Sequence, residues 1–224
     1  MVFPVQVFVA DGLFIQTLFE NPRLFFLQLL IVTFSICVHE YCHAWTALKM
    51  GDSTAADQGH LTLNPMKQMG WMSIAMLLFI GIAWGAVPVD RARLKSRYRY
   101  GAVLTSLAGP FANLGLFLIA WILFGILMQN PPEKILYVLQ AVFLFGLMNG
   151  ILFLLNILPI PGLDGGNCLL ELFPDLCSRI YKSESARGVY VILIFAVFFF
   201  SSYLSEFSCM VMAYAPEFFS SLLN

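Results

Sequence analysis

The chain has 224 residues, of which 60% are hydrophobic and 11% are charged, and its mean hydropathy is +0.83. Soluble domains average about 45–50% apolar and about 25% charged residues, so this composition excludes that class and indicates an integral membrane protein. The net charge of -1, without a basic stretch interleaved with aromatic residues, argues against nucleic acid as a partner.

Several apolar segments have about the length that crosses a bilayer, which is about 20 residues. They comprise residues 24–50, 70–88, 101–128, 135–158 and 189–214. Residues 1–20 are also apolar, but Asp11 and Gly12 interrupt them, so we expect this stretch to lie at the membrane interface. The predicted fold is an all-α polytopic membrane protein with a single domain, 1–224, built as a helical bundle with about five membrane segments.

Charge predicts the orientation of these segments. Residues 90–99 read "DRARLKSRYR", and residues 165–187 carry further Lys and Arg side chains. Cytoplasmic loops are enriched in these residues, so both stretches should face the cytoplasm. The spans 101–128 and 135–158 between them then form an out-and-back pair.

A polar cluster, "HEYCH" at residues 39–43, interrupts the first span. On a helix His39 and His43 share one face, and Glu40 lies about 80° to the side. This is the H-E-x-x-H pattern of a zinc site, in which zinc lowers the pKa of bound water and the glutamate takes the proton. A chance pattern of core histidines is disfavoured, because an unpaired charge at the bilayer centre costs at least about 2.5–3.5 kcal/mol.

A catalytic zinc site also needs a third protein ligand at the same depth. Asp164 stands out, because it follows the fourth span in a loop broken by prolines and glycines. Glu206, His60 and Cys42 are rival ligands. A structural metal site closed by four protein ligands would need Cys42 or Glu206.

Depth restricts the topology. His43 and Asp164 can meet only if the first and fourth spans run in the same direction. The second apolar segment must then begin and end on the same side of the membrane. We therefore expect 70–88 to be re-entrant or buried in the protein, with a turn near Gly81.

Motifs that are weak singly together resemble the site-2 protease family of intramembrane zinc metalloproteases, in its short bacterial branch without PDZ or regulatory domains. They are "HEYCH" (39–43), "GDSTAADQGHLTLNP" (51–65), "AVPVD" (86–90), "LAGPFANL" (107–114) and "NILPIPGLDGG" (156–166). The resemblance covers about residues 20–170, which makes 24–166 the expected catalytic core and 189–214 a C-terminal span. The connector 51–65 could include small strands.

The resemblance implies that His39, His43 and Asp164 bind one Zn²⁺ per chain and that Glu40 activates water. Asn156 matches a family asparagine that holds the substrate or stabilises the oxyanion, although an interhelical hydrogen bond is an equal alternative. Substrates would be membrane proteins with a transmembrane helix, cleaved by a zinc metalloendopeptidase. The expected location is the bacterial inner membrane, with the active site towards the cytoplasm.

The alternative function is a non-proteolytic membrane protein that binds or handles a metal ion at the same site. The sequence also departs from the branch at His60, Gln68 and Gly70, which puts roles carried over to the connector in doubt. Gly109 and Asn113 are expected to serve helix packing, where small residues allow close approach.

Overall fold

The computed structural model of the chain describes residues 14–129, 136–175 and 184–223, without the side chains of 95, 96, 184–201 and 223. These residues form helices and connecting turns, and no strand occurs among them. The helices α2 (Pro22–Lys49), α7 (Gly101–Leu127) and α8 (Leu136–Asn156) are long and apolar enough to cross a membrane. The chain is therefore an integral, multi-pass, all-α membrane protein, which confirms the predicted fold class.

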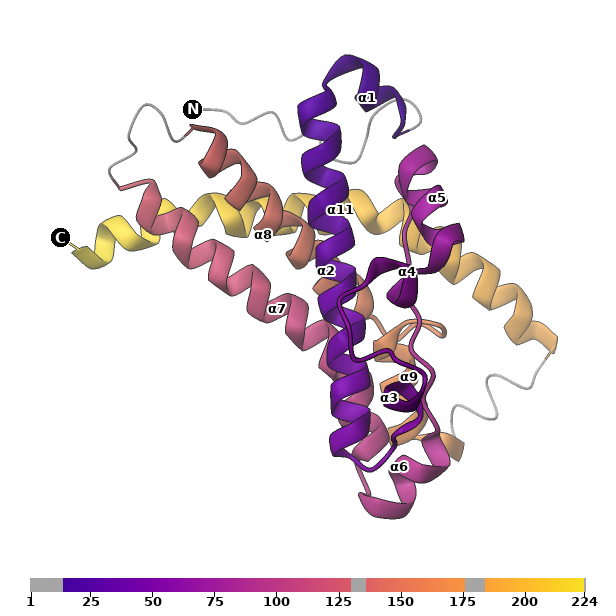
Figure 1. The fold of residues 1–224 in the computed structure, drawn as a ribbon. Helices are drawn as coiled ribbons and strands as arrows, with labels where there is room; N and C mark the ends of the chain where they lie inside the picture. The colour runs from indigo at the N-terminus through magenta and orange to yellow at the C-terminus, as the bar shows by residue number, and fades with distance from the viewer. Residues whose placement is uncertain (1–13, 130–135, 176–183, 224) are drawn as a thin grey trace.

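The long helices cross in a bundle whose directions follow from their contacts (Figure 1). Near the C-terminal end of α2, His43 reaches the Thr105 carbonyl near the start of α7. Along α7, Asn113 pairs with Asn149 of α8, and Phe124 further on packs against the earlier Phe143. Both pairs of helices are thus antiparallel, so α2 and α8 run in the same direction, as the depth argument predicts.

The second apolar segment doubles back instead of crossing. Its helix α5 (Gly70–Ile80) has 11 residues, a length of about 16 Å that falls short of the bilayer core of about 30 Å. The helix ends at Gly81, which has a φ of 87° in the left-handed region that favours glycine. The chain then returns in extended form over residues 82–90, here called the return segment, which confirms the predicted turn at Gly81.

Hydrogen bonds hold the return segment against α5 and the connector. The Ser73 hydroxyl donates to the Trp84 carbonyl at 2.6 Å and accepts from the Trp84 N–H at 2.9 Å. The Ala86 N–H donates to the Gln68 carbonyl at 3.0 Å. The side-chain amide of Gln68 donates in turn to the carbonyls of His60 and Thr62. Gln68 therefore joins the connector to the return segment.

The connector 51–65 forms turns and short helices, so the expectation of small strands is wrong. These helices are α3 (Thr54–Asp57) and α4 (Pro65–Gln68). Local side-chain contacts favour a helix start over a strand here. Asn64 accepts from the Met66 N–H at 2.9 Å, and Pro65 occupies the first helical position.

Asp52 fixes the far end of the return segment. Its buried carboxylate accepts from the N–H and hydroxyl of Thr54 and, at 2.6 Å, from the Asp90 N–H. Burial opposes the charge, but these hydrogen bonds outweigh it and hold the pKa of Asp52 below its ordinary value. Asp90 then caps α6 (Arg91–Arg97), the basic helix.

The remaining helices cover the bundle. Residues 1–13 of the predicted interfacial stretch lie outside the described residues, and α1 (Gln16–Glu20) packs beside α2. α9 (Asp164–Leu172) follows the fourth span and packs on α7. The predicted last span, 189–214, lies within α11 (Glu184–Leu223), which crosses α7 and α8; side chains up to residue 201 are not described there.

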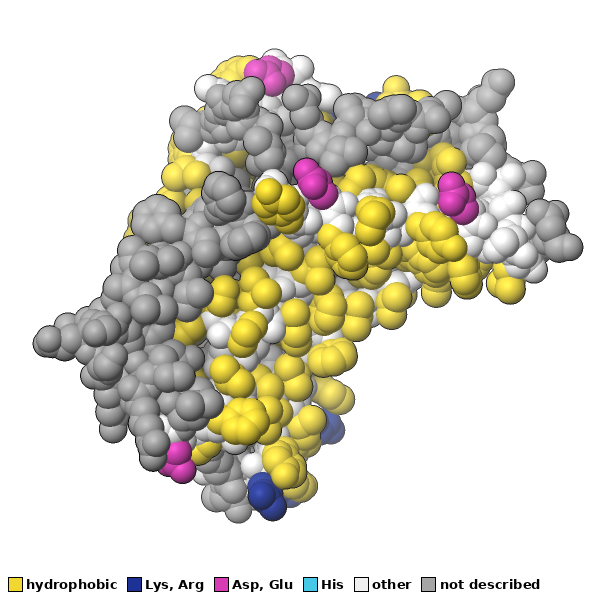
Figure 2. Space-filling view, turned by 180° about the vertical axis from the view of Figure 1, so that it is seen from behind, with side chains coloured by type: hydrophobic (Ala, Val, Ile, Leu, Met, Phe, Trp, Pro, Cys, Tyr) yellow, Lys and Arg dark blue, Asp and Glu magenta, His cyan; other side chains and the backbone are white. Residues whose placement is uncertain are grey.

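The surface agrees with a lipid environment. Figure 2 shows that hydrophobic side chains cover most of the described part of the rear face, with only a few charged side chains among them. Exposed examples from α7 include Ile119 at 62% and Phe111 at 54%. In a bilayer these side chains would face lipid, so their exposure would leave no apolar surface in water.

Candidate metal centre

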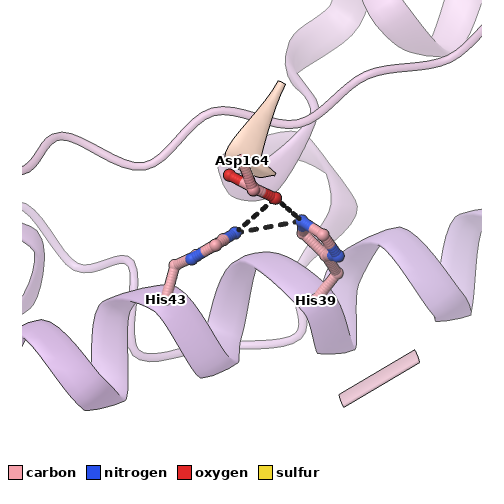
Figure 3. Close-up of side chains that lie close together, drawn as sticks. All are labelled: His39, His43 and Asp164. Atoms are coloured by element: carbon pink, nitrogen blue, oxygen red, sulfur yellow. Dashed lines mark hydrogen bonds and ion pairs between the residues drawn. The ribbon is translucent and has the colours of Figure 1, made fainter. Parts of the chain in front are cut away.

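Three potential metal ligands converge from two helices (Figure 3). His39 and His43 project from one face of α2, and Asp164 opens the first turn of α9. One carboxylate oxygen of Asp164 lies 3.0 Å from His39 Nε2 and 3.2 Å from His43 Nε2. The two Nε2 atoms are 3.0 Å apart. The structure thus brings together the three residues that the sequence predicts as zinc ligands.

The spacing of these donor atoms fits zinc. Zinc bonds of about 2.0–2.1 Å to nitrogen and oxygen place tetrahedral ligands about 3.3 Å apart. The observed separations of 3.0, 3.0 and 3.2 Å are close to that edge. Electron pairs on three atoms this close repel one another unless a cation lies among them. The triangle formed by the Asp164 oxygen and the two Nε2 atoms could therefore hold a zinc ion.

The other nitrogen of each imidazole is held by α7. His43 Nδ1 lies 2.6 Å from the Thr105 carbonyl, which can only accept, so Nδ1 carries the hydrogen. His39 Nδ1 lies 2.6 Å from Asn113 Oδ1. A proton on Nδ1 leaves the lone pair of each imidazole on Nε2, the atom that would bind the metal ion.

Gly109 lets α7 approach the histidines this closely. A Cβ atom at this position would overlap His43 Nε2 and His39 Nε2. Only glycine leaves room for both imidazoles this close to the backbone of α7. Gly109 therefore allows the close approach of helices that the sequence predicts, and it does so directly against the two histidines.

The loop before α9 places Asp164. A Cβ atom at Gly165 would overlap the carbonyls of Ile157 and Leu158, and one at Gly166 would overlap the Ile160 carbonyl. The "DGG" sequence therefore lets the start of α9 lie directly on the chain that leaves α8. This contact carries the Asp164 carboxylate to the histidines.

The rival ligands do not join the triangle. Within the described residues the group of potential ligands contains only His39, His43 and Asp164. Glu206 is exposed on α11, and His60 lies in the connector beside Gln68. Cys42 lies on α2 but outside the group. Among these residues nothing closes the site with a fourth protein ligand.

A cavity of about 440 Å³ opens beside the triangle. Glu40 lines it together with the histidines, and its side chain is 7% exposed. A Cβ atom at Gly85 of the return segment would overlap the Glu40 carboxyl group. Gly85 therefore allows the return segment to pass directly over Glu40.

Asn156 lines the same cavity from the end of α8. Its amide nitrogen donates to the Leu152 carbonyl of the same helix at 3.0 Å, so the described contact is within the helix and not between helices. An amide has two N–H groups, and the bond to Leu152 uses one of them.

Sequence reasoning missed the contribution of α7. Thr105, Gly109 and Asn113 recur every four residues and so share one face of a helix. A small residue between two polar ones on one face of an apolar span is a signal of a polar contact at that depth. The sequence carries this signal, but it does not say which helix the face meets.

Comparisons with known proteins agree with this geometry. The family model "Peptidase family M50" matches residues 133–200. A Bacillus subtilis protein named "Putative zinc metalloprotease YwhC" is 36% identical over 185 residues, which cover 78% of this chain and 81% of that protein. This chain belongs to peptidase family M50, the site-2 protease family. The enzyme is a zinc metalloprotease, and its cofactor is Zn²⁺.

Two further relatives of this M50 peptidase carry the name "Putative zinc metalloprotease Rip2". The Mycolicibacterium smegmatis protein is 33% identical, over 73% of this chain and 63% of the relative. The Mycobacterium tuberculosis protein is 31% identical, over 72% of this chain and 63% of the relative. No solved structure matches the M50 peptidase at a significant level.

Proposed function

We propose that this M50 peptidase hydrolyses peptide bonds of membrane-spanning substrates, within or next to the bilayer. His39, His43 and Asp164 hold the zinc ion in this proposal, and Glu40 is the general base. The convergence of three donor atoms at zinc-like separations inside a membrane-spanning helix bundle is the observation that carries it. Membrane proteins with a transmembrane helix are the substrates that such a buried site could reach.

A zinc ion held by His39, His43 and Asp164 would supply Lewis acidity, which would lower the pKa of a bound water towards about 7 and polarise the substrate carbonyl. Glu40 lines the same cavity and belongs to no group of potential ligands in the described residues, so its carboxylate is available to take the proton of the attacking water. The same group can return the proton to the leaving amine.

The return segment favours an extended substrate. Residues 83–87 line the cavity in extended form beside Glu40. A helical substrate keeps its carbonyls in internal hydrogen bonds, so it must unwind before the carbonyl can be attacked. Asn156 also lines the cavity, where its remaining N–H could donate to the oxyanion or to the substrate backbone.

The basic helix α6 supports a cytoplasmic orientation. Arg91 lines the cavity at the start of α6 and pairs with Glu171 and Asn167 of α9. The cavity therefore lies at the end of the bundle that carries the Arg-rich segment, which the positive-inside rule places in the cytoplasm. In a bacterium this membrane would be the inner (cell) membrane, and the matched relatives are bacterial.

The test compares the wild type with Glu40→Gln in cells that lack another copy of the enzyme. Quantitative analysis of the membrane proteome should show single-span precursors that accumulate in the variant. Zinc content of the purified variant should equal that of the wild type, because a glutamine leaves the triangle intact. Glu20→Gln, at an exposed glutamate of α1, is the matched control and should behave as the wild type.

Equal precursor levels in the wild type and Glu40→Gln, with zinc retained in both, would overturn the proposal. That result would favour a membrane protein that only binds or handles the metal, because such a protein has no need of a base beside the site.

A further inference from the structure

A hydrogen-bonded chain of side chains leads from His39 into the core of the bundle. His39 Nδ1 contacts Asn113 Oδ1 at 2.6 Å. The Asn113 amide nitrogen donates to Asn149 Oδ1 at 2.9 Å. The Asn149 amide nitrogen donates to the Phe145 carbonyl at 2.9 Å and to the Ser35 hydroxyl at 2.9 Å. These contacts join α2, α7 and α8.

The polar members of this chain lie out of reach of water. Asn113, Asn149 and Ser35 are 0% exposed, and His39 is 6% exposed. A buried amide must satisfy its donors and its acceptor inside the protein, because an unpaired one costs about 1–3 kcal/mol. Each contact along the chain must therefore pair a hydrogen-bond donor with an acceptor, which fixes the orientation of both amides.

The Phe145 carbonyl fixes the direction of these hydrogen bonds, because it can only accept. It requires the nitrogen side of the Asn149 amide to face it, and so turns Asn149 Oδ1 towards Asn113. A flipped Asn113 would place its oxygen against Asn149 Oδ1 and near the Ser35 carbonyl, which lies 3.5 Å from Asn113 Nδ2. Asn113 Oδ1 is thus left facing His39, where it accepts the Nδ1 hydrogen.

We propose that Asn149 is a positioning residue for the metal site, which fixes the Asn113 amide and through it the tautomer of His39. The two histidines differ in this respect. His43 is oriented by one backbone carbonyl, whereas His39 depends on a relay through Asn113 and Asn149. The inference rests on the proposed role of His39 as a zinc ligand.

The expected effect is a change in metal binding. Loss of an outer partner of a metal-bound histidine usually lowers metal affinity by about 10–100-fold. Asn113→Leu should fall in this range. Asn149→Leu removes the group that orients Asn113 and should weaken zinc binding by about tenfold. Asn149→Asp should bind as the wild type, because a buried neutral carboxyl can accept from Asn113 and donate to the Phe145 carbonyl.

The experiment measures zinc affinity of the purified full chain in detergent by competition with a chelator. The visible spectrum of the Co²⁺-loaded protein reports the ligand field directly and does not depend on cleavage. Ser208→Ala is the matched control, because it removes another buried hydrogen bond to α8, from Ser208 to the Leu147 carbonyl, without a link to His39. It should leave affinity and spectrum unchanged.

A double variant separates the relay from general packing. The relay predicts that Asn149→Leu costs no further affinity once Asn113→Leu is present, because the chain to His39 is already broken. Additive losses, or a wild-type affinity and Co²⁺ spectrum for Asn149→Leu, would overturn the inference. If Asn149→Leu does not fold, Asn149→Asp decides: wild-type affinity supports the relay, and a loss of more than about tenfold overturns it.

These outcomes are distinct from failure of the proposed function. A wild type that binds zinc but cleaves no membrane substrate would overturn the proteolytic role and leave the relay standing. Unchanged zinc binding on loss of His39 itself would instead overturn the ligand assignment on which both depend.

Discussion

The two walls of the cavity are built differently. One wall is α2 against α7, where buried side chains and a glycine fix the imidazoles. The other wall is the return segment, an extended chain held by hydrogen bonds to Ser73 and Gln68. The helical wall holds the two imidazoles of the metal site, and the extended wall contacts Glu40. Metal binding should therefore depend on the first wall, and peptide cleavage on both.

Gly109→Ala should give the largest effect, because its methyl group would occupy the space of both Nε2 atoms. We expect zinc affinity to fall by more than about 100-fold, beyond the loss usual for an outer partner. Cleavage should be lost with the metal. Zinc content and cleavage of a model single-span substrate measure the two effects.

Gly115→Ala is the control for Gly109→Ala. Gly115 lies on the same helix, and a Cβ atom there meets nothing within 4 Å. Zinc binding by Gly109→Ala at wild-type affinity would contradict the close approach of α7.

Gly85→Ala should separate the two walls. Its methyl group would overlap the Glu40 carboxyl group and leave the metal triangle untouched. Cleavage should fall by about 10²–10⁴-fold, the usual contribution of a general base, while zinc content stays at the wild-type level. Loss of zinc together with cleavage would show that the walls are not independent.

Gln68→Leu should have a smaller effect on the extended wall. The variant leaves the carbonyls of His60 and Thr62 without the amide that now donates to them, at a cost of about 1–3 kcal/mol. We expect a lower thermal unfolding temperature and a several-fold loss of cleavage, with zinc retained. Gln58→Leu, at an exposed position of the connector, provides the comparison. If both variants cleave and unfold like the wild type, Gln68 does not hold the return segment.

The sequence predicts the helical wall better than the extended one. His39 and His43 are found from sequence because helical spacing alone brings them to one face, and Asp164 because its depth matches theirs. The turn near Gly81 is predicted because the second apolar segment must begin and end on the same side of the membrane. The path of the return segment over Glu40 does not, because it depends on hydrogen bonds among segments far apart in the chain, such as Ala86 to Gln68.

The connector and α7 show the same limit of local patterns. Strands were expected in residues 51–65, whereas the side chains of Asp52 and Asn64 instead bind nearby backbone and favour turns and short helices. Asn113 reads from sequence as a packing residue, because nothing local reveals that His39 lies opposite. Both features become visible only when the packed neighbours are known.

X-ray absorption at the zinc edge of the Glu40→Gln protein tests the central claim most directly. The account predicts one zinc per chain with only nitrogen and oxygen neighbours at about 2.0–2.1 Å, and with the multiple scattering of two imidazoles. His39→Ala and Asp164→Ala should each lower zinc occupancy. A sulfur neighbour at about 2.3 Å, as Cys42 would give, or full occupancy after loss of Asp164, would contradict it.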